Sequence, residues 1–197
     1  MRSATAGACA LIMAATAFTA AGASNQVEQD GATVLSYMMR LFNAESAMKR
    51  GMRAQFDSSG LDENAQSLVA AALARIDLNE LVGHMAPIVA SKVSATDLHT
   101  CAQAVRQPGA TAALAAVPVS EDQMGALQQL SPAHQNEVVA LMSLPCMKSV
   151  NAALLMPETQ DAGKAYGRSL ACKAFEHREE IEMLRRAGHC TGHAKAP

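Results

Sequence analysis

The chain has 197 residues, of which 50% are hydrophobic and only 3% aromatic, with no Trp and a formal net charge of −2. A near-neutral charge without a basic stripe argues against a nucleic-acid partner, and the length suits one folded domain of ordinary size. A core this short of aromatic side chains must be built from Ala, Leu, Val and Met. Such a core favours closely packed helices.

The N-terminal stretch has the order of features found in a secretory signal peptide. Arg2 precedes an uncharged, Ala-rich run over residues 4–21, and a small-x-small site ends at Ala23. These features predict cleavage after Ala23, and a run of Ala and Thr is too weakly apolar to favour a membrane anchor. No later stretch reaches the roughly 18 apolar residues of a spanning helix. We therefore expect a periplasmic or secreted bacterial protein with no transmembrane segment after cleavage.

Apolar residues recur at three- and four-residue steps through most of the remaining chain, which predicts an all-α, single-domain bundle of roughly seven to nine helices. Residues 24–31 are expected to form a flexible leader, residues 32–187 the helical domain and residues 188–197 a flexible tail. Within the domain, one helix is expected over residues 32–56 and the next over residues 61–76. Asp77 and Glu80 form a capping box for the third helix.

Two stretches, about residues 93–117 and 130–154, are similar at an offset of 37 residues. Each begins with a Ser N-cap, Ser94 or Ser131, runs through an apolar helix and reaches a proline, Pro108 or Pro145. The offset is typical of helical-hairpin repeats and predicts two similar hairpins. Their expected buried faces consist of Leu98, Cys101, Ala102 and Val105 in the first unit and Val138, Val139 and Met142 in the second. Between them, Ser120 is expected to cap a short helix.

The longest helix is expected over residues 159–187, with Gly188 as its stop. The cysteines left after signal cleavage are Cys101, Cys146, Cys172 and Cys190, and an even number in an exported protein predicts two disulfides. An unbroken helix would hold Cys172 and Cys190 about 27 Å apart, whereas a disulfide needs Cα atoms within about 7 Å. The helix therefore disfavours the pairing of Cys172 with Cys190, and with it the Cys101–Cys146 bond. Two sets of disulfides remain: 101–172 with 146–190, or 101–190 with 146–172.

One set of motifs follows the signal peptide and runs from the helix end Ile76-Asp77-Leu78, through the cap Ser94-x-x-Asp97-Leu98, to Pro108-Gly109. Over about residues 32–114 this set resembles the exported bacterial family called domain of unknown function 2059. The chain departs from the family pattern at Ala104-Val105, where an aromatic pair is usual, and at Gly109, which comes one residue early. The resemblance implies an exported all-α domain and no catalytic residues.

The C-terminal tail contains candidate metal ligands in His189, Cys190 and His193. Thiolate and imidazole groups suit Cu(I) or Zn, and methionines such as Met48 and Met52, one turn apart, would add soft ligands. In an exported protein, however, an oxidised Cys190 is favoured over a free thiol, and Met is the adaptable filler of a core that lacks aromatics. We therefore assign no metal and no cofactor.

No phosphate-binding loop, nucleophile elbow, metalloprotease pair or CxxC motif is present in the sequence. His84, His99 and His134 have no acid or nucleophile at the sequence spacing of a known catalytic motif. His177 falls on the apolar stripe of the last helix. The sequence thus predicts a non-enzymatic protein of the bacterial envelope that binds an unknown envelope protein or ligand through a helix face or groove. The alternative is a copper- or zinc-binding protein that uses the tail and the methionines.

Overall fold

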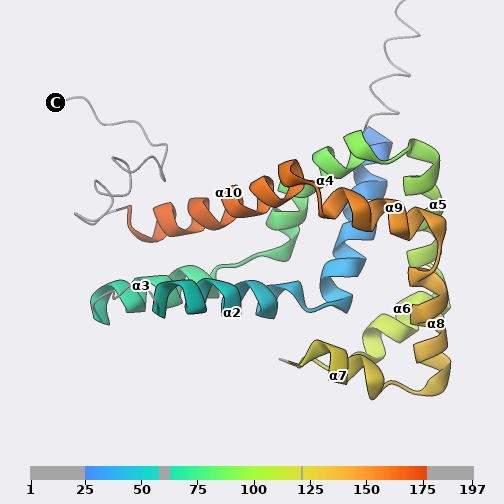
Figure 1. Cartoon of the computed structure of the whole chain (residues 1–197), viewed down its shortest axis with the longest axis horizontal. Coiled ribbons are helices and arrows are strands. Elements are labelled where there is room, and N and C mark those ends of the chain that lie inside the picture. Colours follow the sequence, from blue (N-terminus) through green and yellow to red (C-terminus); the bar gives the residue numbers. More distant parts are fainter. Residues whose placement is uncertain (1–24, 58–62, 121, 177–197) are drawn as a thin grey trace, which may run out of the picture.

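The computed structural model describes residues 25–57, 63–120 and 122–176, and these residues form helices joined by short turns (Figure 1). An N-terminal helix over residues 25–41 is followed by α2 (Ala44–Asp57), α3 (Glu63–Ala74), α4 (Leu78–Lys92), α5 (Ala95–Val105), α6 (Pro108–Ala116), α7 (Gln123–Gln128), α8 (Pro132–Met142), α9 (Pro145–Leu154) and α10 (Pro157–Ala174). The described part of the chain contains no strand. The predicted all-α, single-domain fold is confirmed.

The N-terminal helix begins and ends earlier than the sequence predicts. Residues 25–31, expected to be a flexible leader, are helical, and Asp30 among them is 2% exposed because it pairs with side chains of α5 and its end. The helix expected over residues 32–56 breaks at Asn43, whose φ of 46° lies in the left-handed region that Asn tolerates better than most residues. The side-chain amide of Asn43 donates from Nδ2 to the carbonyl oxygen of Ser120 at 2.8 Å. As Figure 1 shows, α2 therefore leaves the N-terminal helix in a new direction.

Helices α4 and α10 pack against each other at one edge of the core. Asp77 caps α4, as predicted, by accepting from the amide of Asn79 at 2.8 Å. Glu80, expected to complete a capping box, instead pairs with Lys173 of α10 at 3.4 Å. The hydroxyl of Tyr166 accepts from the Asp77 amide at 2.8 Å and donates to the Asp77 carbonyl at 3.1 Å. The start of α4 is thus held by the middle of α10.

The last described helix is shorter than the sequence predicts. α10 ends at Ala174, and a turn follows at Phe175, whose side chain is only 6% exposed. No Gly or Pro marks this end, so the helical pattern alone does not reveal it. His177 and the expected stop at Gly188 lie outside the described residues.

Both predicted helix pairs are present, as α5–α6 and α8–α9. Helices α8 and α9 turn by 72° at their junction, so the second unit is an open corner rather than an antiparallel hairpin, and we keep the word hairpin only as a name for the two units. Ser94 and Ser131 cap their first helices by accepting from the amide three residues on, at 3.1 and 3.3 Å. Pro108 and Pro145 occupy the first position of the second helices, where a missing N–H costs nothing. The hairpins pack with α5 on α9 and α6 on α8.

The disulfides differ from the sequence prediction. Cys101 of α5 and Cys146 of α9 are bonded, with Cα atoms 5.8 Å apart, so each of the four alternative bonds of Cys101 or Cys146 with Cys172 or Cys190 is wrong. That argument depended on an unbroken helix to residue 187, and α10 ends thirteen residues sooner. Cys172 is also in a disulfide; Cys190 lies outside the described residues.

The predicted buried face of the second hairpin is wrong at one position. Val139 is 64% exposed, while Leu141, on another side of α8, is 5% exposed. Val138 and Met142 are partly buried against the core. The face turned inward is set by the packing of α8 on α6 and α9, which the apolar pattern of α8 does not encode.

No single helix among the described residues is both long and apolar enough to cross a membrane. Helices α8 and α9 reach that length and composition only when taken together, and they are bent by 72° at their junction.

Candidate functional site

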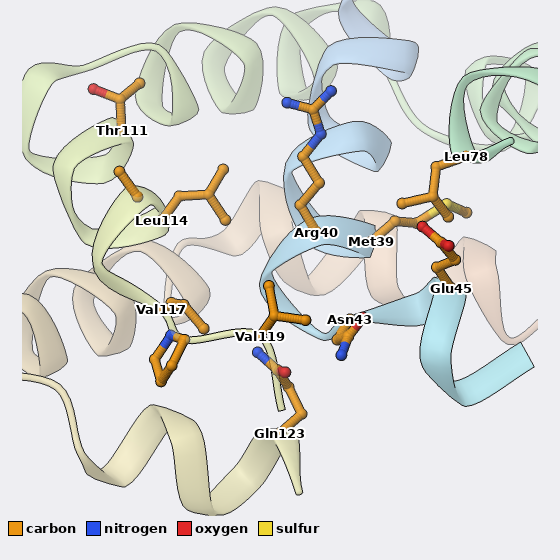
Figure 2. Close-up of a pocket in the computed structure, with 12 residues that line it drawn as sticks. Met39, Arg40, Asn43, Glu45, Leu78, Thr111, Leu114, Val117, Val119 and Gln123 are labelled. Carbon is orange, nitrogen blue, oxygen red and sulfur yellow. The ribbon is translucent and has the colours of Figure 1, made fainter. Parts of the chain in front are cut away.

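A pocket of about 570 Å³ opens where the N-terminal helix breaks. It lies between the end of that helix, the start of α4, α6 and the segment that leads into α7 (Figure 2). Its lining consists of Met39, Arg40, Asn43, Glu45, Leu78, Thr111, Leu114, Ala115, Val117, Pro118, Val119 and Gln123. The pocket is a shallow surface depression with both apolar and polar lining residues, so a ligand bound there would stay partly exposed to solvent.

Two side-chain hydrogen bonds hold the walls of the pocket together. Asn43 donates to the Ser120 carbonyl, and Nε2 of Gln123 donates to the Leu41 carbonyl at 2.7 Å. The first bond joins the break in the N-terminal helix to the segment before α7, and the second joins the end of that helix to the first residue of α7. Asp122 caps α7 by accepting from the Gly125 amide at 2.9 Å, so the predicted cap at Ser120 is wrong.

The charged groups of the pocket are not balanced. Glu45 forms an ion pair with Lys49 one turn further along α2. The exposed guanidinium of Arg40 makes no hydrogen bond or ion pair with any described residue. Figure 2 shows Arg40 extending between Leu114 on one side and Met39 on the other. The site therefore presents an unpaired positive charge against apolar walls.

One polar atom of the lining is buried without a partner. Oε1 of Gln123 accepts no hydrogen bond within the described part of the chain. Burying an acceptor unsatisfied costs about 1–3 kcal/mol, so such an atom beside a pocket is a candidate contact for a ligand donor. Sequence reasoning missed this residue because Gln123 resembles an ordinary helix-start residue until the fold brings it against Leu41.

The neighbourhood of the pocket is rich in exposed apolar side chains. Val119 of the lining is 93% exposed. Phe42, next to Asn43, is 39% exposed, and Met124, next to Gln123, is 64% exposed. Each of these three side chains thus belongs to the lining or adjoins it in the sequence.

A second polar cluster joins the N-terminal helix to the first hairpin. The buried carboxylate of Asp30 lies 2.9 Å from Nδ1 of His99 and 3.5 Å from the Arg106 guanidinium, and Gln26 donates to it at 3.1 Å. Nε2 of His99 lies 2.9 Å from Nε2 of the Gln103 side chain. This pattern fits a neutral imidazole that donates from Nδ1 to Asp30 and accepts at Nε2.

The Asp30–His99 pair could not be found from sequence spacing, because 69 residues separate its members. An imidazole oriented by a carboxylate is half of the arrangement used for general-base catalysis. Here the remaining ring nitrogen is occupied by Gln103, and the cluster lines no part of the pocket described above. Its place between the N-terminal helix and α5 indicates a role in holding the two helices together.

The other histidines and methionines named from the sequence are dispersed. His84 lies against Tyr166, with ring centroids 5.7 Å apart, and His134 lies at the start of α8. Met48 packs against the core, whereas the side chain of Met52, like His189, Cys190 and His193, lies outside the described set. Within that set no group of three or more His, Cys, Asp or Glu side chains is arranged to hold a metal ion.

No family model matches the chain, and neither the curated proteins nor the solved structures provide a match. The resemblance to domain of unknown function 2059 therefore stays a prediction.

Proposed function

We propose that this chain is a non-enzymatic binding protein of the bacterial envelope, and that the pocket beside Asn43 binds a molecule with an apolar body and an anionic group. The observation that carries the proposal is the pairing of apolar walls with the unpartnered Arg40 guanidinium. An anion gains a charge-assisted hydrogen bond there, and its apolar body covers Leu114 and Val117. Neither gain depends on a catalytic group.

Export to an oxidising compartment is part of the same proposal. The signal-like N-terminus, with its basic start and small-x-small site, supports it. The Cys101–Cys146 disulfide supports it independently, because disulfides persist outside the reducing cytosol. Processing after Ala23 is checked by N-terminal sequencing of protein recovered from an osmotic-shock fraction.

Fluorescence titration with anilinonaphthalene sulfonate, a small apolar anion, tests the pocket directly. The oxidised mature chain should bind the dye saturably, near one molecule per chain. Val119→Glu adds a negative charge at the pocket and disturbs little packing, because the native side chain is 93% exposed. We expect this variant to weaken dye binding about tenfold or more.

Val139→Glu is the matched control, since Val139 is also an exposed valine, 64% accessible, and lies on α8 rather than at the pocket. It should leave the dye affinity within about twofold of the wild type. Equal effects of the two substitutions would show that the dye binds elsewhere and would overturn the assignment of the site. Turnover of a hydrolase or oxidoreductase substrate by the purified chain would overturn the non-enzymatic part.

A further inference from the structure

Two polar groups of the pocket lack hydrogen-bond partners, and they require ligand groups of opposite character. The Arg40 guanidinium can donate to an anion, whereas Oε1 of Gln123 is a buried acceptor that needs a donor. Turning the Gln123 amide over does not solve this, because Nε2 already donates to the Leu41 carbonyl and Oε1 would then face that oxygen. A ligand that satisfies both groups must carry an anion and an N–H or O–H donor.

This requirement separates two kinds of amphipathic carboxylate. An ionised fatty acid has a carboxylate and a hydrocarbon chain but no donor, so it leaves Oε1 of Gln123 buried and unsatisfied. The end of a peptide has a terminal carboxylate, backbone N–H groups and side chains that can be apolar. Building on the proposed function, we infer that the pocket binds the C-terminal segment of an apolar peptide.

The lining gives each part of such a peptide a place. The terminal carboxylate pairs with Arg40, whose planar guanidinium can donate two parallel hydrogen bonds to it. The last side chains cover the apolar wall formed by Leu78, Leu114 and Val117. A backbone N–H donates to Oε1 of Gln123.

One movement is needed for the last of these contacts. Oε1 of Gln123 is buried, and in the view of Figure 2 the Val119 side chain lies between the Gln123 amide and Arg40. Val119 is 93% exposed and therefore covers little of Oε1, so the Gln123 side chain must itself shift towards the peptide. The peptide then covers both residues, and the apolar side chain of Val119 packs on the bound peptide instead of facing water.

Fluorescence anisotropy with a labelled pentapeptide that ends in Ala-Leu-Leu tests the inference on the oxidised mature chain. The peptide is used as the free acid and as the C-terminal amide. We expect the acid to bind saturably and the amide to bind about tenfold more weakly, because the amide cannot form the charge-assisted pair. Dodecanoate is tested as a competitor in the same assay.

Variants assign the two polar contacts. Arg40→Gln should weaken the acid to the level of the amide and leave the amide unchanged, while Arg40→Lys should recover part of the difference. Arg50→Gln, an exposed arginine of α2 outside the pocket, removes the same charge and should change neither peptide. Gln123→Leu should weaken both peptides by the same factor, about fivefold or more, because it removes the acceptor together with the bond to the Leu41 carbonyl and leaves Arg40 in place.

Three results would overturn the inference. They are equal affinity for acid and amide, an acid-to-amide ratio that survives Arg40→Gln, and tight dodecanoate binding without peptide binding. In each case dye binding that still responds to Val119→Glu and not to Val139→Glu keeps the pocket as the binding site. Loss of both the dye and the peptide signals overturns the proposed function as well.

Discussion

The two hairpins have the same local structure in different surroundings. In the sequence alignment of the two units, α5 corresponds to α8 and α6 corresponds to α9. The contact between α5 and α9 therefore has a counterpart in the contact between α8 and α6, and both contacts are present. The α5–α9 pair faces the N-terminal helix, α4 and α10. The α6–α8 pair lies below it in Figure 1 and meets the N-terminal helix through α6, where the Tyr37 hydroxyl donates to the Ala110 carbonyl. We call these the inner pair and the outer pair.

The difference shows at equivalent positions. The disulfide of the inner pair, Cys101–Cys146, corresponds to Val138 and Gly109 in the outer pair, which cannot bond. Ala102 of the inner pair is fully buried, whereas its counterpart Val139 is 64% exposed. Local sequence thus determines the caps and lengths of the helices, and packing with the rest of the chain determines which of their faces is buried.

Removing the disulfide takes away the covalent bond of the inner pair, which the outer pair does not have. The double variant Cys101→Ala/Cys146→Ala opens a loop of 45 residues, for which the chain-entropy model gives a loss of about 4 kcal/mol. Thermal unfolding followed by circular dichroism should show a midpoint lower by roughly 10 °C. A midpoint within about 2 °C of the wild type would contradict the prediction. Reducing the double variant then measures the separate effect of the Cys172 disulfide.

A disulfide added to the outer pair tests the same comparison by strengthening the pair that lacks one. If the pairs are equivalent, Gly109→Cys/Val138→Cys should form a bond between α6 and α8 and stabilise the chain by about 3 kcal/mol, less any strain. A Cβ at residue 109 would lie 2.8 Å from the Glu137 carboxylate, which can move because it ends a flexible side chain. Non-reducing peptide mapping detects the bond. The single variant Val138→Cys is the control, and two free thiols in the double variant would rule out the equivalence.

The same comparison shows what could be predicted from the sequence. The two units, their Ser caps and their helix-starting prolines were predictable because each signal lies within a few residues of its effect. The break at Asn43 and the end of α10 at Ala174 carry weaker local signals, since neither has the Gly or Pro that usually marks an end. An error at the second of these led directly to the wrong disulfide pairing.

The candidate site was less predictable than the fold. Arg40 and Gln123 are ordinary helix residues until the turn at Asn43 brings their segments together. Asp30 and His99 become partners only when the N-terminal helix, expected to begin at residue 32, extends back to residue 25 and packs on α5. Contacts between segments about 70 to 80 residues apart leave no periodic trace in a single sequence.

High pH should weaken the contact between the N-terminal helix and α6. Burial, with the Glu137 carboxylate nearby, raises the pKa of Tyr37 to about 12, and its hydroxyl donates to the Ala110 carbonyl at 3.2 Å. A raised folded-state pKa means that this stabilisation is complete below pH 10 and is lost as pH rises towards 12. Urea unfolding at several pH values should show a fall of about 2 kcal/mol attributable to this group. Tyr37→Phe should flatten the slope; an unchanged slope would contradict the assignment.

Breaking the Asp30 cluster tests why the inner pair is held more firmly. His99→Ala leaves the buried Asp30 carboxylate with fewer partners, so we expect a loss of about 1.5 kcal/mol in urea unfolding. Asn136→Ala is the matched control, because residue 136 is the counterpart of His99 on α8 and is exposed. It should change stability by less than about 0.5 kcal/mol. Similar losses at both positions would show that helix propensity, not the Asp30 contact, sets the effect.

The smallest predicted effect concerns the feature that the two hairpins share. Ser94 and Ser131 each satisfy one free amide at a helix start, at 3.1 and 3.3 Å, so Ser94→Ala and Ser131→Ala should each cost about 1 kcal/mol. The corresponding Gly variants should cost only a few tenths of a kcal/mol. Equal losses in global unfolding require that α5 and α8 melt in one cooperative transition. If Ser131→Ala instead leaves global stability unchanged and speeds amide hydrogen exchange only within α8, the outer pair opens on its own. The identical caps thus report whether the different surroundings of the hairpins also give them different stabilities.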